Sequence, residues 1–374
     1  MLIIVAVSLR TPEQVFITDG YPELTYVNQA GGKPEAELQE GLGQANKIIS
    51  IVGASKTGKS TLCDKYFGSE KILIPGGRIE NMHGLWSEAY RQIGGKITEG
   101  YARNVLGETL DALTKRGLPV VLDDFHYVDR QVQRVICQQM KNEAARGLRF
   151  IVINTPHRGD DPIRNNSDLS GRFFKVDLQF WTAQDLMEIG KKGFSGVGLR
   201  VSGEVLDILA REALGSPQLM QTLCLETCRS MPEDTPYEQQ TVDHTNFDIA
   251  KVREKTVRSY DHSTALHYLR EGPGERGRAR NVYTFQDGST GDVYTALVRC
   301  LTLDPPFVSI TLGQIKARVS QIVMEGEMPN MAAALSHLND LFKDDYRPME
   351  WDGDKELLWV VDPHFYFYLR CKPI

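Results

Sequence analysis

One eight-residue stretch of the chain reads Gly53-Ala54-Ser55-Lys56-Thr57-Gly58-Lys59-Ser60. It stands between Lys47–Val52, an apolar run that predicts a buried strand, and Lys59–Phe67, which has the pattern of a helix. Glycine at the first and sixth positions, followed by Lys-Ser, matches the phosphate-binding loop pattern without a mismatch. A strand before the loop and a helix after it form the context that supports such a match. The stretch therefore predicts a phosphate-binding loop at the end of a buried strand.

The residue types of this loop suit a triphosphate. Several backbone N–H groups must converge on one point, and Gly53 and Gly58 let the chain curl around phosphates without Cβ clashes. The helix that begins near Lys59 adds the partial positive charge of its N-terminus. Lys59 is expected to bring a charge to the outer phosphates, and Ser60 to bind Mg²⁺. We expect ATP and Mg²⁺ to bind along residues 53–61, which include Thr61; the alternative is a glycine-rich turn that binds nothing.

A second motif lies downstream, where the apolar run Pro119-Val-Val-Leu ends in Asp123 and Asp124. An apolar strand that ends in two acids is typical of the Walker B element of P-loop enzymes. Asp123 is expected to hold Mg²⁺ directly or through water, and Asp124 to polarise the attacking water as a general base. Many such enzymes have Glu at the second position, so hydrolysis by this chain is expected to be slow or to need a partner subunit. The alternative is that both are acids that end a strand.

The next two strands also end or begin in candidate residues. Asn154 follows the run Phe150–Ile153 and is expected to orient water and sense the γ-phosphate, unless it only caps the turn before Pro156. Arg172 precedes the strand predicted over Phe173–Leu178. It is expected to act as an arginine finger on a nucleotide held by an adjacent protomer, unless it anchors its own loop. The alternative partners of Arg172 are Asp160, Asp161 and Asp168, and we expect His126, His157 and Arg158 to pack or cap.

The alternation of β-branched runs with amphipathic stretches predicts an α/β fold with a parallel sheet covered on both faces. Further strands are expected at Lys71–Ile74, Pro119–Leu122 and Arg149–Ile153, with helices over 81–116 and 131–146. The predicted organisation is a leading segment 1–45, an ATPase domain 46–180, a helical lid 181–231, a linker 232–290 and a C-terminal domain 291–374. The last part predicts helices over 292–303, 311–323 and 330–343, followed by a hairpin about Asp352-Gly-Asp354. This is the order of a winged helix.

With these motifs in this order, the chain resembles AAA+/STAND P-loop ATPases, in the branch related to replication initiators and prokaryotic defence proteins. The resemblance implies a sheet of strand order 5-1-4-3-2. It implies that Pro217, in Leu214-Gly-Ser-Pro-Gln-Leu219, packs on adenine; the alternative is a proline that starts a helix. Tyr26 and Val27 fall where the family places an apolar pair beside adenine, but Asn28-Gln29 replaces its Gly-Arg. The lid has no clear second-sensor arginine, Arg211 being the nearest, which fits STAND proteins better than ring-forming unfoldases.

Charge helps to choose between DNA and protein as the partner of the C-terminal domain. Residues 291–374 contain eight Lys/Arg against twelve Asp/Glu, a net charge of −4, and residues 330–343 have one basic residue, Lys343. Because phosphate contacts supply most nucleic-acid affinity, we favour packing against protein. A basic segment contains the arginines at 270, 276, 278 and 280. One interpretation is that it contacts nucleic acid or an acidic partner; the alternative is a solvated loop.

Composition sets the remaining limits. The hydrophobic fraction of 41%, charged fraction of 25% and net charge of −6 are ordinary for a globular protein. Six scattered cysteines without Cys-x-x-Cys spacing favour core packing, and the apolar start Met1–Leu9 is too short to span a bilayer. We expect a cytoplasmic protein with no membrane partner.

The leading hypothesis is an ATP-hydrolysing STAND-like switch that signals through a partner protein or by oligomerisation, and the resemblance alone suggests prokaryotic defence. The rival is a DNA-binding ATPase of replication initiation or transposition targeting. A third class is a nucleotide-binding scaffold that does not hydrolyse.

Overall fold

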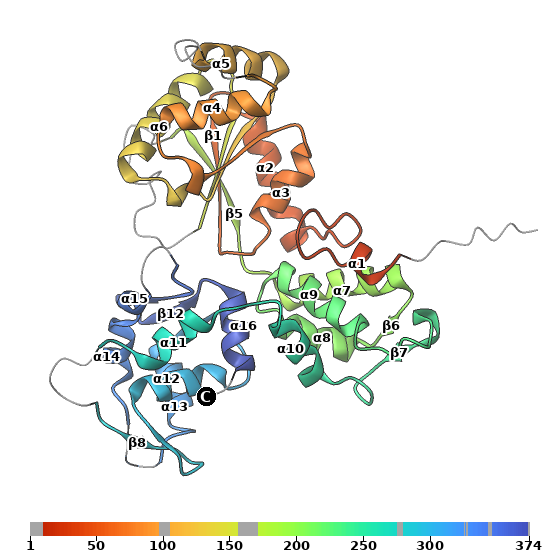
Figure 1. Cartoon of the computed structure of the whole chain (residues 1–374), viewed down its shortest axis with the longest axis vertical. Coiled ribbons are helices and arrows are strands. Elements are labelled where there is room, and N and C mark those ends of the chain that lie inside the picture. The colour runs from red at the N-terminus through yellow and green to blue at the C-terminus, as the bar shows by residue number, and fades with distance from the viewer. Residues whose placement is uncertain are drawn as a thin grey trace, which may run out of the picture. The chain divides into compact units, whose positions relative to one another are not determined.

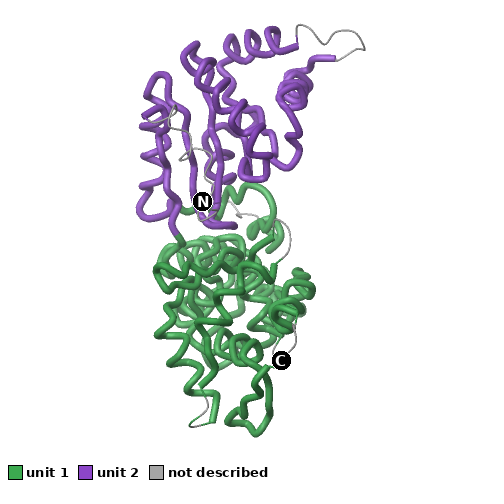
Figure 2. The backbone as a smooth tube through the Cα atoms, turned by 90° about the vertical axis from the view of Figure 1, so that its left-hand side faces the viewer, with its two compact units in different colours: residues 1–27, 180–374 green, residues 28–179 purple. Residues whose placement is uncertain are grey.

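The computed structural model describes residues 10–96, 105–155, 171–274, 280–324, 326, 328–342 and 346–372 (Figure 1). The chain forms two compact units (Figure 2). Unit 2 is Asn28–Gln179. Unit 1 is the chain up to Val27 together with the chain from Phe180 onward.

Unit 2 is built on a five-stranded parallel sheet. Its strands are β1 (Ile48–Gly53), β2 (Ile72–Pro75), β3 (Val120–Asp123), β4 (Phe150–Asn154) and β5 (Phe173–Leu178). They lie side by side in the order β2-β3-β4-β1-β5. This confirms the predicted α/β fold and the strand order 5-1-4-3-2, and it places β1 in the interior of the sheet.

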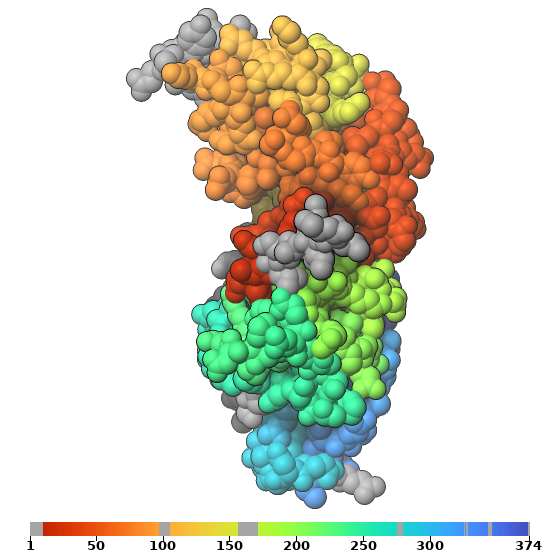
Figure 3. All heavy atoms as spheres, turned by 90° about the vertical axis from the view of Figure 1, so that its right-hand side faces the viewer, coloured from red at the N-terminus to blue at the C-terminus, as the bar shows by residue number. Residues whose placement is uncertain are grey.

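Successive residues of β1 point to opposite faces of the sheet, and each face has its own helices (Figure 1). Ile48 belongs to a core with α4, α5 and α6, and Ile49 and Ile51 to a core with α2 and α3. The helices are α2 (Lys33–Gly43), α3 (Lys59–Phe67), α4 (Met82–Gln92), α5 (Val105–Arg116) and α6 (Arg130–Ala144). The red and orange segments on the flank of unit 2 in Figure 3 include α2 and α3.

The expectation of one continuous helical region over 81–116 is wrong, because α4 and α5 are separate helices. Helix α4 ends at Gln92, and Gly94 follows with φ of +90°, a left-handed conformation that ends a helix and favours glycine. Asn81 caps its first turn by accepting a hydrogen bond from the Gly84 N–H at 2.9 Å. Gln92 itself covers the free edge of β2: its amide donates to the Leu73 carbonyl at 2.8 Å and accepts from the Leu73 N–H at 3.1 Å.

Unit 1 contains a helical region directly after the sheet. Thr182 caps α7 (Ala183–Val197) and Ser202 caps α8 (Gly203–Glu212), each accepting from a backbone N–H three residues on. α9 (Pro217–Cys228) follows, and α10 (Ile249–Val257) and α11 (Ser263–Glu271) lie in the segment expected as a linker. Two-residue strands β6 (Arg200–Val201) and β7 (Thr241–Val242) pair in parallel, and α1 (Pro12–Val15) packs against α7 and α9. Val252 and Leu269 are fully buried, so α10 and α11 are part of the core.

The C-terminal part of unit 1 combines short helices with a three-stranded antiparallel sheet of order β10-β12-β11. Its elements are β8 (Tyr283–Thr284), β9 (Thr290–Gly291), α12 (Val293–Thr302), β10 (Ser309–Thr311), α13 (Leu312–Val319), α14 (Met331–Ser336), α15 (Leu338–Leu341), β11 (Met349–Asp352), β12 (Leu357–Val360) and α16 (Pro363–Cys371). The hairpin expected about Asp352 is present as β11 and β12. The helix expected over 330–343 is broken at His337, and that expected over 311–323 already ends at Val319.

Across the described ranges, every helix is too short or too polar to cross a membrane.

Candidate functional site

The predicted phosphate-binding loop joins β1 to α3 at the carboxyl edge of the sheet. Gly58 has φ of +93° and stands directly before α3. A Cβ on Gly53 would lie 2.7 Å from the Leu178 carbonyl oxygen and 2.9 Å from Thr57 Oγ1, so no larger residue fits there without a shift. Thr57 donates to the Ala54 carbonyl at 2.8 Å. Both loop glycines are thus required by the backbone path, as the pattern predicts.

Lys59 is buried inside this loop, with 7% of its surface exposed. Its Nζ donates to the carbonyl oxygens of Gly53 at 2.8 Å and Ala54 at 2.7 Å. Burial lowers the pKa of Lys59 to about 8, against the opposing effect of Asp124 and Asp123. The ammonium group is therefore held among main-chain oxygens at the centre of the loop, with little water around it.

The two motifs meet at Ser60 and Asp123. Ser60 Oγ donates to Asp123 Oδ2 at 2.8 Å, which joins the first turn of α3 to the end of β3. Burial raises the pKa of Asp123, the Ser60 hydrogen bond lowers it and Asp124 raises it further. Asp124 is exposed and has a left-handed backbone, with φ of 51°, and its N–H donates to Asp123 Oδ1 at 3.0 Å. The side chain of Asp124 therefore comes from a sharp turn directly after the strand.

Asn154 ends β4, the strand between β1 and β3. It pairs in register with Val52, one residue before the loop, and only 4% of its surface is exposed. Neither its amide nitrogen nor its amide oxygen has a hydrogen-bond partner in the part of the chain that the structure describes. An unpaired buried polar group costs about 1–3 kcal/mol, so this amide is a candidate for binding a ligand or water.

These residues fit a magnesium–triphosphate group. Lys59 and the N-terminus of α3 carry the positive charge that phosphates need, and the Ser60 hydroxyl and Asp123 carboxylate are hard oxygen donors. The described residues contain no cluster of three or more His, Cys, Asp or Glu side chains that could hold a metal ion. A site with one carboxylate beside a phosphate loop is the kind that binds Mg²⁺ together with substrate phosphates.

Arg172 lies at the amino end of the parallel strands, whereas the phosphate-binding loop lies at their carboxyl end. Its carbonyl oxygen accepts from the Ile48 N–H at 2.9 Å, so it stands beside the start of β1, whereas the loop follows the end of β1. Of the other predicted residues, His126 is half-buried, and its ring lies tilted against that of Tyr127, with centroids 4.3 Å apart. His157, Arg158, Asp160, Asp161 and Asp168 lie outside the described residues.

Three residues expected near adenine belong to unit 1. The Tyr26 carbonyl accepts from Lys192 Nζ at 2.7 Å, and Val27 packs on the core of that unit. Pro217 is the first residue of α9, where Ser216 caps the helix by accepting from the Leu219 N–H at 3.2 Å. The contact of these residues with adenine stays a prediction.

Gly76 lies beside the site and was not predicted from the sequence. It follows β2 in a short turn, Gly76–Arg78, and its Cα packs against the backbone of Asp124. The only signal in the sequence is a Gly-Gly pair directly after an apolar strand.

No family model matches the sequence, and no curated protein is similar enough to count as a relative. Among solved structures, a Walker-type ATPase of Pyrococcus abyssi is similar, with a TM-score of 0.55, 16% identity, and 95% of this chain and 99% of that chain covered. Cdc6p from Pyrobaculum aerophilum has a TM-score of 0.50 at 14% identity, over 97% of this chain and 98% of that one. At such identity the likeness is one of fold alone. With its strand order β2-β3-β4-β1-β5, the chain has the fold of P-loop NTPases.

Proposed function

We propose that the chain binds ATP with Mg²⁺ and hydrolyses it. The observation that carries this proposal is the 2.8 Å hydrogen bond from Ser60 to Asp123, beside the buried ammonium group of Lys59. It brings the two sequence motifs together at one edge of the sheet, with the charges and oxygen donors that a metal-bound triphosphate requires.

Each of the five polar residues has a part in this proposal. When bound, ATP would supply the transferable phosphoryl group, and Mg²⁺ would supply positive charge to the phosphates. Lys59 leaves the carbonyls of Gly53 and Ala54 to contact phosphate oxygens, and Ser60 and Asp123 hold the metal. Asp124 accepts a proton from the attacking water at its carboxylate. Asn154, whose amide is unpartnered among the described residues, orients that water and senses the γ-phosphate.

The first experiment measures binding. Lys59→Ala is expected to abolish ATP binding, because it removes the only buried cation of the described part of the loop. The control is Lys115→Ala, which removes an exposed cation of α5 outside the loop, and this variant should bind like the wild type. ATP affinity of Lys59→Ala equal to that of the wild type would refute the assignment of the loop.

The second experiment separates binding from hydrolysis. Asp124→Asn keeps the left-handed backbone that Asp and Asn both accept, and it removes the carboxylate. We expect it to bind ATP normally and to trap it, with single-turnover hydrolysis reduced by about 10²-fold or more. Wild-type turnover would exclude Asp124 as the base. If the wild type itself binds ATP but never hydrolyses it, the chain is instead a nucleotide-binding scaffold.

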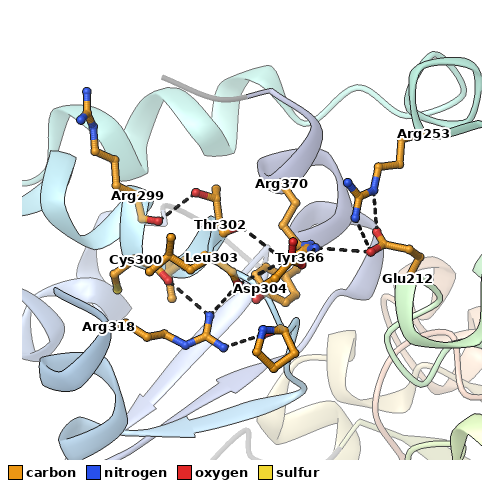
Figure 4. A network of polar contacts seen from close by, with 12 residues as sticks. Glu212, Arg253, Arg299, Cys300, Thr302, Leu303, Asp304, Arg318, Tyr366 and Arg370 are labelled. Atoms are coloured by element: carbon orange, nitrogen blue, oxygen red, sulfur yellow. Dashed lines mark hydrogen bonds and ion pairs between the residues drawn. The ribbon is translucent and has the colours of Figure 1, made fainter. Parts of the chain in front are cut away.

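The wider proposal is a STAND-like switch in which nucleotide state is read by the lid and the C-terminal domain. Its support is a partly buried charge network inside unit 1 (Figure 4). Glu212 of α8 accepts hydrogen bonds from Arg253 of α10 and, at 3.4 Å, from Arg370 of α16. Arg370 also bonds to Asp304 at 2.7 Å. The network links the region proposed as a lid to the C-terminal helices, which we interpret as a winged helix that packs on protein.

DNA binding by the C-terminal domain is the rival proposal. Two of the four arginines of the basic segment are described, and both have partners within the chain. Arg280 is ion-paired with Asp292 at 2.6 Å, and Arg270 donates to the Lys372 carbonyl at 2.9 Å. This favours the switch, signalling through a partner protein or oligomerisation. Salt-dependent duplex binding that disappears when Arg276, Arg278 and Arg280 are neutralised would favour the rival, and no binding at low salt with ATP would remove it.

A further inference from the structure

The turn after β2 lies directly against the turn that carries the proposed general base. β2 pairs with β3, and Pro75 stands opposite Asp123 in the register. The chain leaves β2 through the turn Gly76–Arg78, which packs on the turn Phe125–Tyr127 that follows Asp124. The two turns therefore form one contact at the carboxyl edge of the sheet.

At this contact the two backbones are too close for any side chain on Gly76. A Cβ there would lie 2.2 Å from the Asp124 carbonyl oxygen, 2.8 Å from its carbonyl carbon and 3.1 Å from the Asp123 carbonyl oxygen. All three atoms belong to the main chain, so no rotamer change could make room. The neighbouring Gly77 differs, because a Cβ there would meet nothing within 4 Å. The close approach is specific to one of two adjacent glycines.

Neither side of the contact can easily give way. On the glycine side, the ring of Pro75 fixes its φ at −65°, and the buried Ile79 donates its N–H to the Gly76 carbonyl at 2.9 Å. On the other side, the Asp124 carbonyl accepts from the Tyr127 N–H at 3.0 Å. Phe125 is fully buried, and its carbonyl accepts from Gln133 at 2.9 Å. An added methyl group would therefore displace the backbone of Asp124.

We propose that Gly76 is a positioning residue for Asp124: its missing side chain lets the exit turn of β2 support the backbone from which the Asp124 carboxylate projects. The inference rests on the proposed role of Asp124 as general base. The carboxylate of Asp is one methylene shorter than that of Glu, so its reach to a water depends closely on where its backbone is held.

The test compares Gly76→Ala with Gly77→Ala in the full chain. A displacement of about 1 Å at a catalytic group can cost about 10²-fold, so we expect Gly76→Ala to lower kcat by about that factor. ATP affinity, measured with Mg²⁺ under non-hydrolysing conditions, should stay within about threefold of the wild type, since the displaced group acts on water and not on phosphate. Gly77→Ala should match the wild type in both. Unchanged kcat in a folded Gly76→Ala protein would overturn the inference. A loss of ATP affinity as large as the loss of kcat would overturn it as well.

A rescue variant separates positioning from general damage. Replacing Asp124 by Glu in the Gly76→Ala protein lengthens the side chain by one methylene and should recover part of kcat; no recovery counts against positioning. If Gly76→Ala does not fold, Pro75→Ala loosens the same turn without adding atoms and should lower kcat several-fold at unchanged ATP affinity; wild-type kcat there would overturn the inference. A wild type that binds ATP but does not turn it over would instead contradict the proposed function, so the two failures are distinguishable.

Discussion

Lys59 is a charged group that folding removes from water before any phosphate is bound. Its pKa is lowered from 10.5 to about 8 because burial disfavours the ammonium form more than Asp123 and Asp124 favour it. The unfolded chain therefore binds more protons than the folded chain between these two pH values. It follows that Lys59 destabilises the nucleotide-free protein below about pH 8 and that this cost disappears as the pH approaches 10.5.

Lys59→Met tests the sign of this pH dependence of stability, because methionine has a similar length and does not titrate. The free energy of unfolding of the wild type, relative to that of Lys59→Met, should rise by about 3 kcal/mol between pH 7.5 and 10.5. Urea titrations at several pH values, without nucleotide or Mg²⁺, measure it. A pH-independent difference, or one of opposite sign, would show that the lysine is not desolvated in the folded protein.

The outer edge of β2 is covered by a side chain of α4. β2 is an edge strand, and Gln92 of α4 bonds to both the N–H and the carbonyl of Leu73, in the manner of a neighbouring strand. Gln92→Leu should lower the free energy of unfolding by about 1–2 kcal/mol, since the two hydrogen bonds to Leu73 are lost, and should increase aggregation. Gln138→Leu, an equally polar-to-apolar change at an exposed position of α6, is the control. Equal stability and solubility of the two variants would contradict the protective role.

The elements also show what the sequence could and could not predict. The strand order was implied by the resemblance to P-loop ATPases. A loop after one strand and an acid after another lie at the same edge of a parallel sheet. The meeting of Ser60 with Asp123 was predictable for the same reason. The break after Gln92 was missed because apolar periodicity continues across Gly94, whose positive φ only the fold reveals. Gly76 could not have been found, since its role depends on two turns 48 positions apart in sequence that approach within van der Waals distance.

Across the larger unit, the charges between α8, α10 and α16 make separate segments depend on one another. The side chains of Arg370 and Glu212 are only 4% and 6% exposed. Arg370→Ala breaks the hydrogen bonds of this cation to Glu212 and Asp304, while Glu212 keeps Arg253 as its partner, so the free energy of unfolding should fall by about 1.5–3 kcal/mol. Arg211→Ala on α8, next to Glu212, is the control, because its pair with Asp207 is exposed and contributes about 0–1 kcal/mol. Urea titration measures both, and similar losses would show that the network does not join these segments.

Assembly is the level at which Arg172 would act. β5 runs in register with β1, from Phe173 opposite Ile48 to Leu178 opposite Gly53. At about 3.3 Å per residue, roughly 20 Å of strand separates Arg172 from the phosphate loop of the same chain. An arginine side chain does not bridge that distance along the sheet, so any action on a nucleotide has to be on one held by another copy.

Arg172→Ala should therefore reduce ATP turnover only under conditions in which protomers assemble. An arginine finger contributes about 10³–10⁵-fold, so the turnover of assembled protein should fall towards that of dilute monomers, whose own rate the substitution leaves unchanged. The matched control is Lys47→Ala, which removes a cation at the same edge of the sheet that donates to the Gly171 carbonyl at 2.6 Å. Turnover is measured across a dilution series, with assembly followed by sedimentation. Action in trans would be excluded if Arg172→Ala lowered the turnover of monomers, because the residue would then affect the site of its own chain through the fold. Wild-type turnover that does not depend on protein concentration would exclude it as well.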